Sequence, residues 1–503
     1  MNLSLRSRLR LHFCVRILSA TSSTTLLAFA AHATTIHVPI DAPTIQAGVD
    51  LAAFGDTVEV ACGSYTAGAI LKDGIVIRSA TGFHDCVTIT LSAELTAFRC
   101  TNLGFGCAIE GIRITRASGA RQRGVNIIGS HVSVRDCAFE ELHRIDDLDG
   151  SDLSGVGIKI TQASTVLLER CLFARNIASP GEGAGIYCRD SDLVISDSHF
   201  AENRGTGGGG LRAENSTVTI DDTVFEANRA PGEKGNNYTT GGAILASSGS
   251  AVSIVESAFL RNFASYSGGA VFSTSSVLSV YGSVFEEDST LFPVSGRGGA
   301  ITMDEGAVEQ CRLRSNVTQY RGGGIYSVGS ARIRECTFDN NVSDYSGAGI
   351  SSDGIGDITI ESCTLVNNQS AGNGGGAVDI GEFGTPTMEI RNSIIAFSSV
   401  GSATKCFASN TITTVCCDIF GNAGGDWVGC MAGQQNLNGN ISADPLFCDI
   451  TNGDYTLQGN SPCALPHSGA CGQIGAFGVG CDAVSVDPGF EERSWGAIKG
   501  LYR

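Results

Sequence analysis

One pattern recurs along most of this 503-residue chain and constrains its fold more than any other feature. A Phe or another large apolar residue is followed three positions later by Asn in most copies, and an aliphatic residue stands five positions before it. A repeat of 25 to 34 residues predicts a solenoid, in which each copy packs on the next. The Phe-type positions are Phe139, Phe173, Phe200, Phe225, Phe259, Phe285, Leu313, Phe338, Leu365 and Ile395.

The residues between these positions indicate short β-strands. Segments such as Ser216–Ile220 alternate polar and apolar residues with a period of two, which is typical of strands with one buried face. Each repeat also carries a run of small residues that ends in an aliphatic one, such as Gly241–Ile244, where glycine allows bends and close backbone approach. We therefore expect about three strands in each repeat.

Stacking of like residues predicts the interior of this solenoid. If residues from about 56 to 400 form coils of about 27 residues spaced by about 4.8 Å, the rod has about 13 coils. The Phe-type column then becomes an internal ladder, and the Asn column bonds side chain to backbone between neighbouring coils. We interpret both columns as structural and assign no ligand to the Asn residues. They are Asn176, Asn203, Asn228, Asn262, Asn316, Asn341 and Asn368, with Asp288 in one copy.

The alternation of Gly-Gly-Ala-Ile type runs with Phe-x-x-Asn over residues 155–378 resembles the repeats of chlamydial polymorphic outer membrane proteins. It also resembles the wider set of bacterial right-handed β-helix repeat proteins with a pectin-lyase-like fold. The resemblance implies an all-β, single-stranded right-handed parallel β-helix at a secreted or surface location, often with a role in adhesion. It implies no single activity.

The first 33 residues have the pattern of a cleaved secretory signal. Four arginines precede an apolar stretch from Ile17 to Ala31, and Ala31-His32-Ala33 fits a cleavage site. A membrane anchor is the weaker alternative, because the stretch is short and contains Ser and Thr. We therefore expect an exported chain that begins at Thr34. Loss of four arginines and no acids changes the formal charge from −18 to −22, which disfavours nucleic acid as a partner.

The ends of the rod are expected to be capped. Ile45, Val49 and Ala52 fall at helical spacing, which predicts a short helix over the open end of the first coil. Eight cysteines between Cys406 and Cys481 predict a disulfide-stapled cap, with a zinc site as the less favoured alternative. The full division is residues 1–33 signal, 34–108 N-terminal cap and first coils, 109–400 repeats, 401–481 Cys-rich terminal coils and cap, and 482–503 tail. The end of the tail, Trp495–Arg503, is interpreted as a frayed terminus or a sorting signal.

Five other cysteines lie two residues before Phe-type positions. This placement predicts small buried side chains in one column, whose reactivity is suppressed by burial. We expect packing rather than chemistry from Cys137, Cys171, Cys311, Cys336 and Cys363.

The first candidate site is the charged interruption of the repeat between Arg135 and Asp152. A lyase acting on uronate needs a basic side chain near a calcium ion, so His143 and Arg144 are the candidate catalytic residues. Three carboxylates around a Gly turn favour calcium, with a solvated acidic loop as the alternative. The candidate calcium ligands are Asp147, Asp149 and Asp152.

Tyrosines in the variable turns form the second candidate site. Tyr266, Tyr320 and Tyr345 stand five residues before the aliphatic that ends a Gly run, and Tyr238 stands six before it. Rings stacked on a flat side of the rod suit sugar rings or a protein partner, whereas stacking that merely closes the turn is the alternative.

Three functions fit these features. The leading hypothesis is a non-catalytic, monomeric cell-surface or extracellular protein for adhesion or glycan binding, with a polysaccharide or a surface protein as partner and calcium as the only candidate cofactor. The alternative is a polysaccharide lyase or glycoside hydrolase acting on uronate-containing polysaccharide. A purely structural surface-layer role is the third. No segment after the signal is long and apolar enough to be a transmembrane span.

Overall fold

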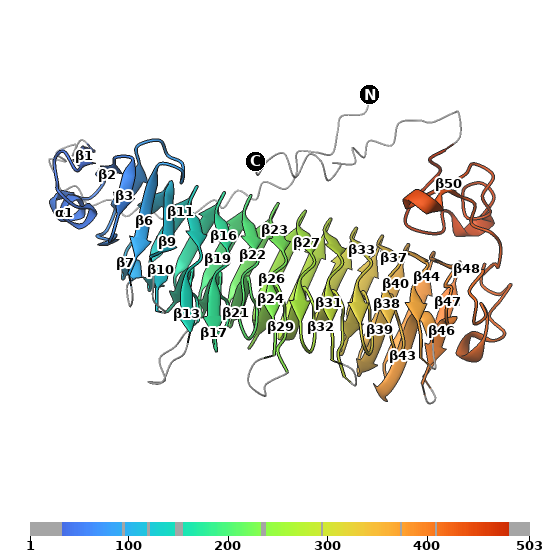
Figure 1. Cartoon of the computed structure of the whole chain (residues 1–503). Helices are drawn as coiled ribbons and strands as arrows, with labels where there is room; N and C mark the ends of the chain where they lie inside the picture. Colours follow the sequence, from blue (N-terminus) through green and yellow to red (C-terminus); the bar gives the residue numbers. More distant parts are fainter. Residues whose placement is uncertain are drawn as a thin grey trace, which may run out of the picture.

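The chain forms a right-handed parallel β-helix, a rod of stacked coils (Figure 1). This computed structural model describes residues 33–92, 96–117, 121–145, 154–232, 238–292, 295–372, 375–407 and 410–481. Thirteen of the 14 strands of one sheet begin before residue 400, in agreement with the number of coils that the repeat length predicts. In the described ranges, no helix is long and apolar enough to cross a membrane.

Three parallel sheets run along the rod, and each of them receives one or more strands from successive coils. Sheet B has 14 strands: β3 (Gly63–Tyr65), β6 (Val87–Leu91), β9 (Ile112–Arg116), β12 (Ala138–Glu140), β16 (Leu172–Ala174), β20 (His199–Ala201), β23 (Val224–Glu226), β27 (Ala258–Leu260), β30 (Val284–Glu286), β33 (Arg312–Arg314), β37 (Thr337–Asp339), β41 (Thr364–Val366), β45 (Ile394–Ala396) and β48 (Asp418–Phe420). Sheet C has six short strands: β24 (Arg229–Ala230), β28 (Phe263–Ala264), β31 (Ser289–Thr290), β34 (Val317–Thr318), β38 (Val342–Ser343) and β42 (Gln369–Ser370).

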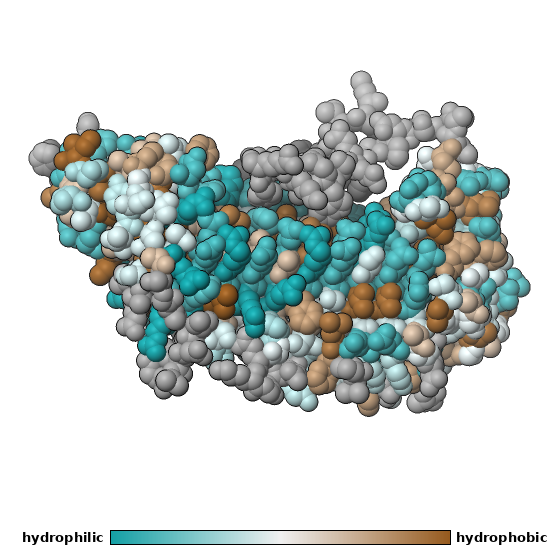
Figure 2. All heavy atoms as spheres, viewed as in Figure 1, coloured by the Kyte–Doolittle hydropathy of each residue, from teal (hydrophilic) through white to brown (hydrophobic). Residues whose placement is uncertain are grey.

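Sheet A is the largest and presents its outer face to solvent along much of the rod. Its 26 strands are β1 (Thr35–Val38), β2 (Thr57–Val60), β4 (Ala69–Ile70), β5 (Val76–Ser79), β7 (Thr96–Thr101), β8 (Cys107–Glu110), β10 (Arg123–Ile128), β11 (His131–Arg135), β14 (Ile158–Thr161), β15 (Thr165–Glu169), β18 (Ile186–Arg189), β19 (Asp192–Ser196), β21 (Leu211–Glu214), β22 (Thr217–Asp221), β25 (Ile244–Ser247), β26 (Ala251–Val255), β29 (Val271–Tyr281), β32 (Ile301–Glu309), β35 (Ile325–Ser327), β36 (Ala331–Arg334), β39 (Ile350–Gly354), β40 (Asp357–Glu361), β43 (Gly375–Gly384), β44 (Thr387–Arg391), β46 (Ser402–Cys406) and β47 (Ile412–Val415). Figure 2 shows hydrophilic side chains over much of the central coils.

The predicted aromatic ladder is confirmed in the core. Six successive Phe rings, from Phe139 to Phe285, stack with centroids 4.6 to 4.9 Å apart and nearly parallel planes. This spacing is the distance between neighbouring strands, so each ring takes its place from the backbone register of sheet B. All six rings are fully buried.

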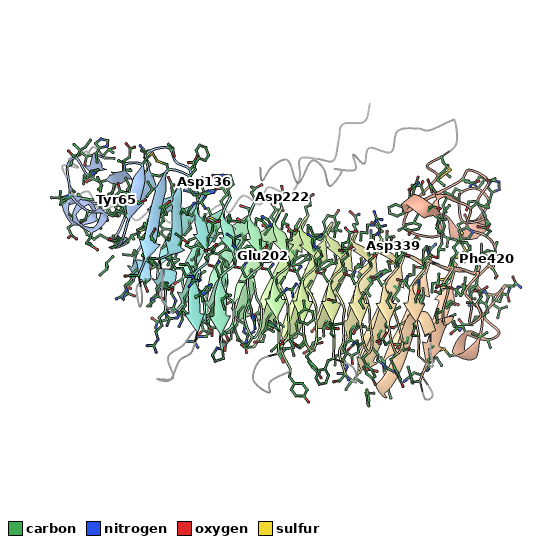
Figure 3. The ribbon with its side chains drawn as sticks, in the orientation of Figure 1. Tyr65, Asp136, Glu202, Asp222, Asp339 and Phe420 are labelled. Atoms are coloured by element: carbon green, nitrogen blue, oxygen red, sulfur yellow. A yellow bond between two sulfur atoms is a disulfide. The ribbon has the colours of Figure 1, made fainter. Side chains whose placement is uncertain are left out.

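The Asn column is confirmed as structural. Asn203 donates from Nδ2 to Phe173 O (2.8 Å) and to Asn228 Oδ1 (2.9 Å), and its backbone N–H donates to the same Asn228 Oδ1 (3.1 Å). The residue before it, Glu202, has a φ of 55° and turns the chain at this bend (Figure 3). The side chain therefore replaces the backbone partners that the bend removes.

The cysteines that precede the Phe-type positions are also confirmed as buried packing residues, and the structure adds a second role. They share their column with Ser and Thr: Cys171 N donates to Ser198 Oγ (3.1 Å), and Cys311 N donates to Cys336 Sγ (3.4 Å). Burial raises the pKa of the Cys336 thiol well above its usual value. A small polarisable side chain at this bend thus accepts a backbone hydrogen bond and remains inert.

The predicted N-terminal helix is confirmed as α1 (Ile45–Leu51). Thr44 caps it by accepting a hydrogen bond from Ala47 N at Oγ1 (3.1 Å), and Ile45 and Val49 are buried against the first coil. A helix at this position covers backbone groups that have no preceding coil.

The Cys-rich segment closes the far end of the rod and then forms an additional lobe. Met431, the last residue of the short helix η1 (Gly429–Met431), is fully buried against the last coils. Residues 444–481, the C-terminal lobe, fold back over the outer face of sheet B, where Phe447 and Tyr455 pack with Val366 and Ile394. The lobe contains the antiparallel pair β49 (Phe447–Asp449) and β50 (Asp454–Leu457), with η2 (Ile450–Asn452) and η3 (Gly469–Cys471).

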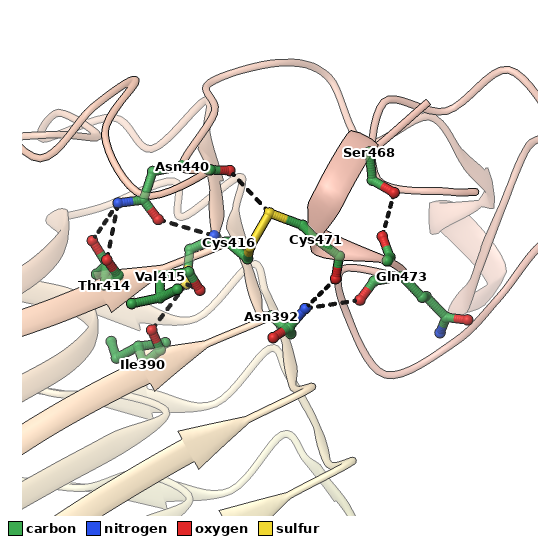
Figure 4. Close-up of a disulfide and its surroundings, with 12 residues drawn as sticks. Ile390, Asn392, Thr414, Val415, Cys416, Asn440, Ser468, Cys471 and Gln473 are labelled. Carbon is green, nitrogen blue, oxygen red and sulfur yellow. Dashed lines mark hydrogen bonds between the residues drawn. A yellow bond between two sulfur atoms is a disulfide. The ribbon is translucent and has the colours of Figure 1, made fainter. Parts of the chain in front are cut away.

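Six of the eight clustered cysteines form disulfides, which confirms the stapled segment. The pairs are Cys406–Cys430, Cys416–Cys471 and Cys448–Cys481, and a fourth bond, Cys62–Cys86, lies near the other end. The second of these ties the lobe to the coils, and beside it Asn392 Nδ2 donates to Cys471 O (2.8 Å) (Figure 4). Cys417 and Cys463 are instead unpaired and buried.

Replacing Asp288 by Asn is expected to stabilise the rod. Asp288 occupies the Asn column without an amide group to donate, is fully buried, and has a pKa raised by that burial. An amide would supply the missing donor to the column and would remove the cost of a buried carboxyl, a gain of about 1–3 kcal/mol. Because the folded-state pKa is raised, wild-type stability declines as pH rises, so the gain should grow with pH. Urea unfolding at pH 5 and pH 8 measures it.

The opposite change, at a position of the Asn column that holds Asn, provides the control. Asn228→Asp removes the Nδ2 donor to Phe200 O (2.8 Å) and should destabilise the protein. Equal unfolding midpoints for the two variants would contradict this account of the column.

Candidate functional site

Of the first sequence-predicted site, the structure describes His143 and Arg144. His143 and Arg144 lie on β13 (His143–Ile145), which pairs with β17 (Ile177–Ser179) in a separate two-stranded sheet. His143 is partly buried, and burial together with nearby Arg116 lowers its pKa. Arg144 Nη1 donates to Arg121 O at 3.5 Å. The candidate calcium ligands Asp147, Asp149 and Asp152 lie outside the described residues.

The four predicted tyrosines form two clusters. Tyr320 and Tyr345 stack with centroids 4.8 Å apart, while Tyr238 meets Tyr266 edge to face at 5.2 Å, with Phe292 as a third ring. Tyr238 is 64% exposed, and the other four rings of these turns, three from tyrosines and one from Phe292, are partly buried. The structure thus brings the four tyrosines together as two pairs of neighbours along the rod, not as one cluster.

A buried arginine that the sequence did not indicate explains the Tyr320–Tyr345 pair. The Arg321 guanidinium is fully buried and lies 5.1 Å from the Tyr345 ring and 4.3 Å from the Phe407 ring. It also donates from Nη1 to Asp353 Oδ1 (3.1 Å), with Asp379 Oδ2 4.0 Å from Nε. The rings cover an internal ion cluster, which favours turn closure as the role of this tyrosine pair.

A groove of about 340 Å³ lies on the outer face of sheet A, across the coils of β5, β8, β11 and β15. Its volume is at the lower end of the range of small-molecule sites. Side chains alternate between the inner and outer faces of a strand. Small side chains that point outward, such as Ala108 and Ser133, form part of the groove lining. The lining residues are Val76, Phe105, Gly106, Cys107, Ala108, Glu110, His131, Val132, Ser133, Arg135, Thr165 and Leu167.

An aromatic pair forms one wall of this groove. The Phe105 ring stacks on the His131 ring with a centroid distance of 4.1 Å and an interplanar angle of 15°, and the Phe105 side chain is 76% exposed. Phe105 stands between Gly104 and Gly106, whose φ of 93° requires glycine. One face of a large ring is therefore fixed by the protein while much of the residue remains open to solvent.

A charged triad lies near the far ends of these strands, and two of its members, Glu110 and Arg135, line the groove. Arg135 Nη1 lies 3.0 Å from Glu110 Oε1, and Arg135 Nε lies 3.3 Å from Glu169 Oε2. The three residues occupy the same position on β8, β11 and β15, as the register Glu110–Arg135–Glu169 shows. The two carboxylates hold the guanidinium in place and balance its charge.

A carboxyl with a strongly raised pKa lies away from the groove. Burial raises the pKa of Asp418 to about 7, the range of a general acid. Asp418 is fully buried, however, and accepts hydrogen bonds from Ala443 N (3.0 Å) and Cys463 Sγ (3.1 Å), which belong to the segment that covers it. Its burial between the last coils and this covering segment indicates a structural role.

A comparison with protein families supports the fold. Residues 72–259, which contain the whole groove, match the family model described as a right-handed β-helix region. No curated protein matches the chain. Among solved structures, the chain is similar to the PL6 family alginate lyase AlyGC, with 14% identity and a TM-score of 0.42, over 84% of this chain and 55% of the lyase. The chain thus spans just over half the length of that structure, and the likeness assigns no activity. The resemblance to polymorphic outer membrane protein repeats remains a prediction.

Arg321→Met is expected to destabilise the protein by about 3–5 kcal/mol, because it leaves Asp353 and Asp379 buried without their cation. Arg332→Met is the matched control, since that side chain is 52% exposed in a surface pair with Glu309. Denaturant unfolding of both variants measures the difference. A similar cost at the two positions would mean that the Arg321 cluster contributes little.

Stability is expected to depend on pH through Asp418. Its folded-state pKa of about 7 exceeds its ordinary value of 3.8, so the native state binds this proton more tightly than the unfolded chain. The free energy of unfolding therefore falls by about 3 kcal/mol as pH rises from 5 to 8. Asp418→Asn should flatten that part of the pH profile. Thermal unfolding of both proteins across this range tests it, and parallel profiles would contradict the assignment.

Proposed function

We propose that this protein is an exported, non-catalytic β-helix protein that binds glycan in the sheet A groove. One observation carries the proposal: Phe105 presents a largely exposed ring, fixed from behind by His131, at the edge of a groove that polar groups also line. Apolar sites with a few placed polar groups are typical of ligand binding.

The chemistry of the groove lining fits a sugar. The CH face of a pyranose ring packs on an aromatic face, and the ring of Phe105 is already held, so little conformational entropy is lost on binding. Sugar hydroxyls can both donate to Glu110 and accept from Arg135, whose geometry the triad fixes. Ser133 and Thr165 add hydroxyl groups to the lining.

Export is supported by the cysteine chemistry. Four disulfides connect described residues at both ends of the rod. Disulfides persist in oxidising compartments, in agreement with the signal expected in residues 1–33. That signal lies outside the described residues apart from Ala33.

Phe105→Ala is expected to weaken glycan binding by about tenfold or more, because the stacking face is lost. The purified protein is first tested on an array of neutral and uronate-containing glycans, and the best ligand is then titrated by calorimetry. Phe83→Ala is the control, since Phe83 is 62% exposed and outside the groove lining. Phe105→Tyr should retain binding.

The same incubations test the catalytic alternative. Release of reducing or 4,5-unsaturated ends, lost on substitution of His143 or Arg144, would replace this proposal with a lyase or hydrolase. Retention that is equal in the wild type and in Phe105→Ala would place binding elsewhere, and the exposed Tyr238 would then be the next residue to substitute.

A further inference from the structure

A second exposed aromatic ring lies in line with the groove. Phe54, 69% exposed, packs over Gly74, where a Cβ would collide with its ring. Gly55 N donates to Gly74 O (3.0 Å), and a Cβ on Gly106 would lie 3.7 Å from Gly74 Cα, so Phe54 and Phe105 precede glycines of neighbouring backbone segments. Both rings therefore lie along the same edge of the rod.

The two rings are separated by two coils. The register runs from Thr57 to Val76 and Ala108, and then to Ser133, one coil at each step. Phe54 covers the coil of Gly74, while Phe105 covers that of His131. With one coil between them, the rings are spaced by about 10 Å along the rod. This spacing is close to the repeat of two sugar units in an extended 1,4-linked chain, in which alternate rings face the same way.

The polar groups near these rings favour an uncharged ligand. Arg135 is already paired with Glu110 and Glu169, and the backbone segment between the two aromatic residues carries Asp73, which accepts a hydrogen bond from Gly104 N (2.6 Å). Within the groove lining, a uronate carboxylate would lie near Glu110 and would compete with it for Arg135, the one arginine of that lining, whereas a neutral hydroxyl bonds to either kind of group.

We propose that the groove binds a neutral, extended 1,4-linked glycan that lies along the rod axis, with Phe54 and Phe105 contacting every second sugar. This inference rests on the proposed glycan-binding function. It adds the class of ligand, its direction and a second contact residue.

Calorimetric titration of the purified protein with oligosaccharides of two to six units tests the inference. The probes are cello-, xylo-, manno- and chito-oligosaccharides, with oligogalacturonate and oligoalginate as the acidic series. A neutral series should bind, and its affinity should rise by about tenfold or more between the disaccharide and the tetra- to hexasaccharide. Phe54→Ala should remove this rise without changing disaccharide affinity, and Phe105→Ala should weaken both. Phe83→Ala should change neither, and thermal unfolding verifies that all variants remain folded.

The outcomes separate the inference from the function on which it rests. Binding of uronate oligomers that depends on Phe105 would retain the proposed function and overturn the ligand class. Neutral binding that is indifferent to Phe54 at every chain length would overturn the axial arrangement. Absence of binding to either series would reject the proposed function itself.

Discussion

The structure depends on finding partners for backbone N–H groups at the bends between strands. Strands bond to the neighbouring coil, but each bend interrupts that ladder, and a buried unpaired N–H is costly. Here a side chain of the next coil accepts instead, as Asn228 does from Asn203 N and Ser198 does from Cys171 N. Each coil must therefore present a small polar group at the same place as its neighbour. This requirement fixes the offset between aliphatic, Phe and Asn positions while leaving the length of the outer turns free.

The groove lies where extra residues are inserted directly after one position of this internal column. Ser130 Oγ accepts from Leu103 N (3.0 Å), as Ser164 Oγ accepts from Ser130 N (3.1 Å), so Leu103 is the structural counterpart of the column serines in its coil. The Gly104–Gly106 segment follows Leu103 before strand β8 resumes, and it carries Phe105 out of the column onto the surface. The interior register is retained while one aromatic side chain is displayed. The rigid coils then fix its distance from other exposed residues.

The sequence predicts what repeats and cannot predict what occurs once. The Phe and Asn columns are visible because many copies share one offset, and their stacking follows from strand spacing. Arg321 gave no such signal, since its partners Asp353 and Asp379 come from later coils and each resembles an ordinary surface acid in sequence. Cysteine pairing was equally inaccessible. Phe105 could have been noticed as a lone Phe between glycines, but only the structure places His131 behind it.

Two aromatic features of the rod differ in a way that decides their roles. The Tyr345 ring lies near the buried guanidinium of Arg321 and stacks against Tyr320, so its interactions are largely provided by the protein itself. Phe105 has one ring partner, His131, and remains 76% exposed, although exposing an aromatic side chain forgoes the free energy of burial. That exposed face is open to a ligand. The proposed binding site therefore lies in the groove, and the contacts of the tyrosine pair favour closure of its turns.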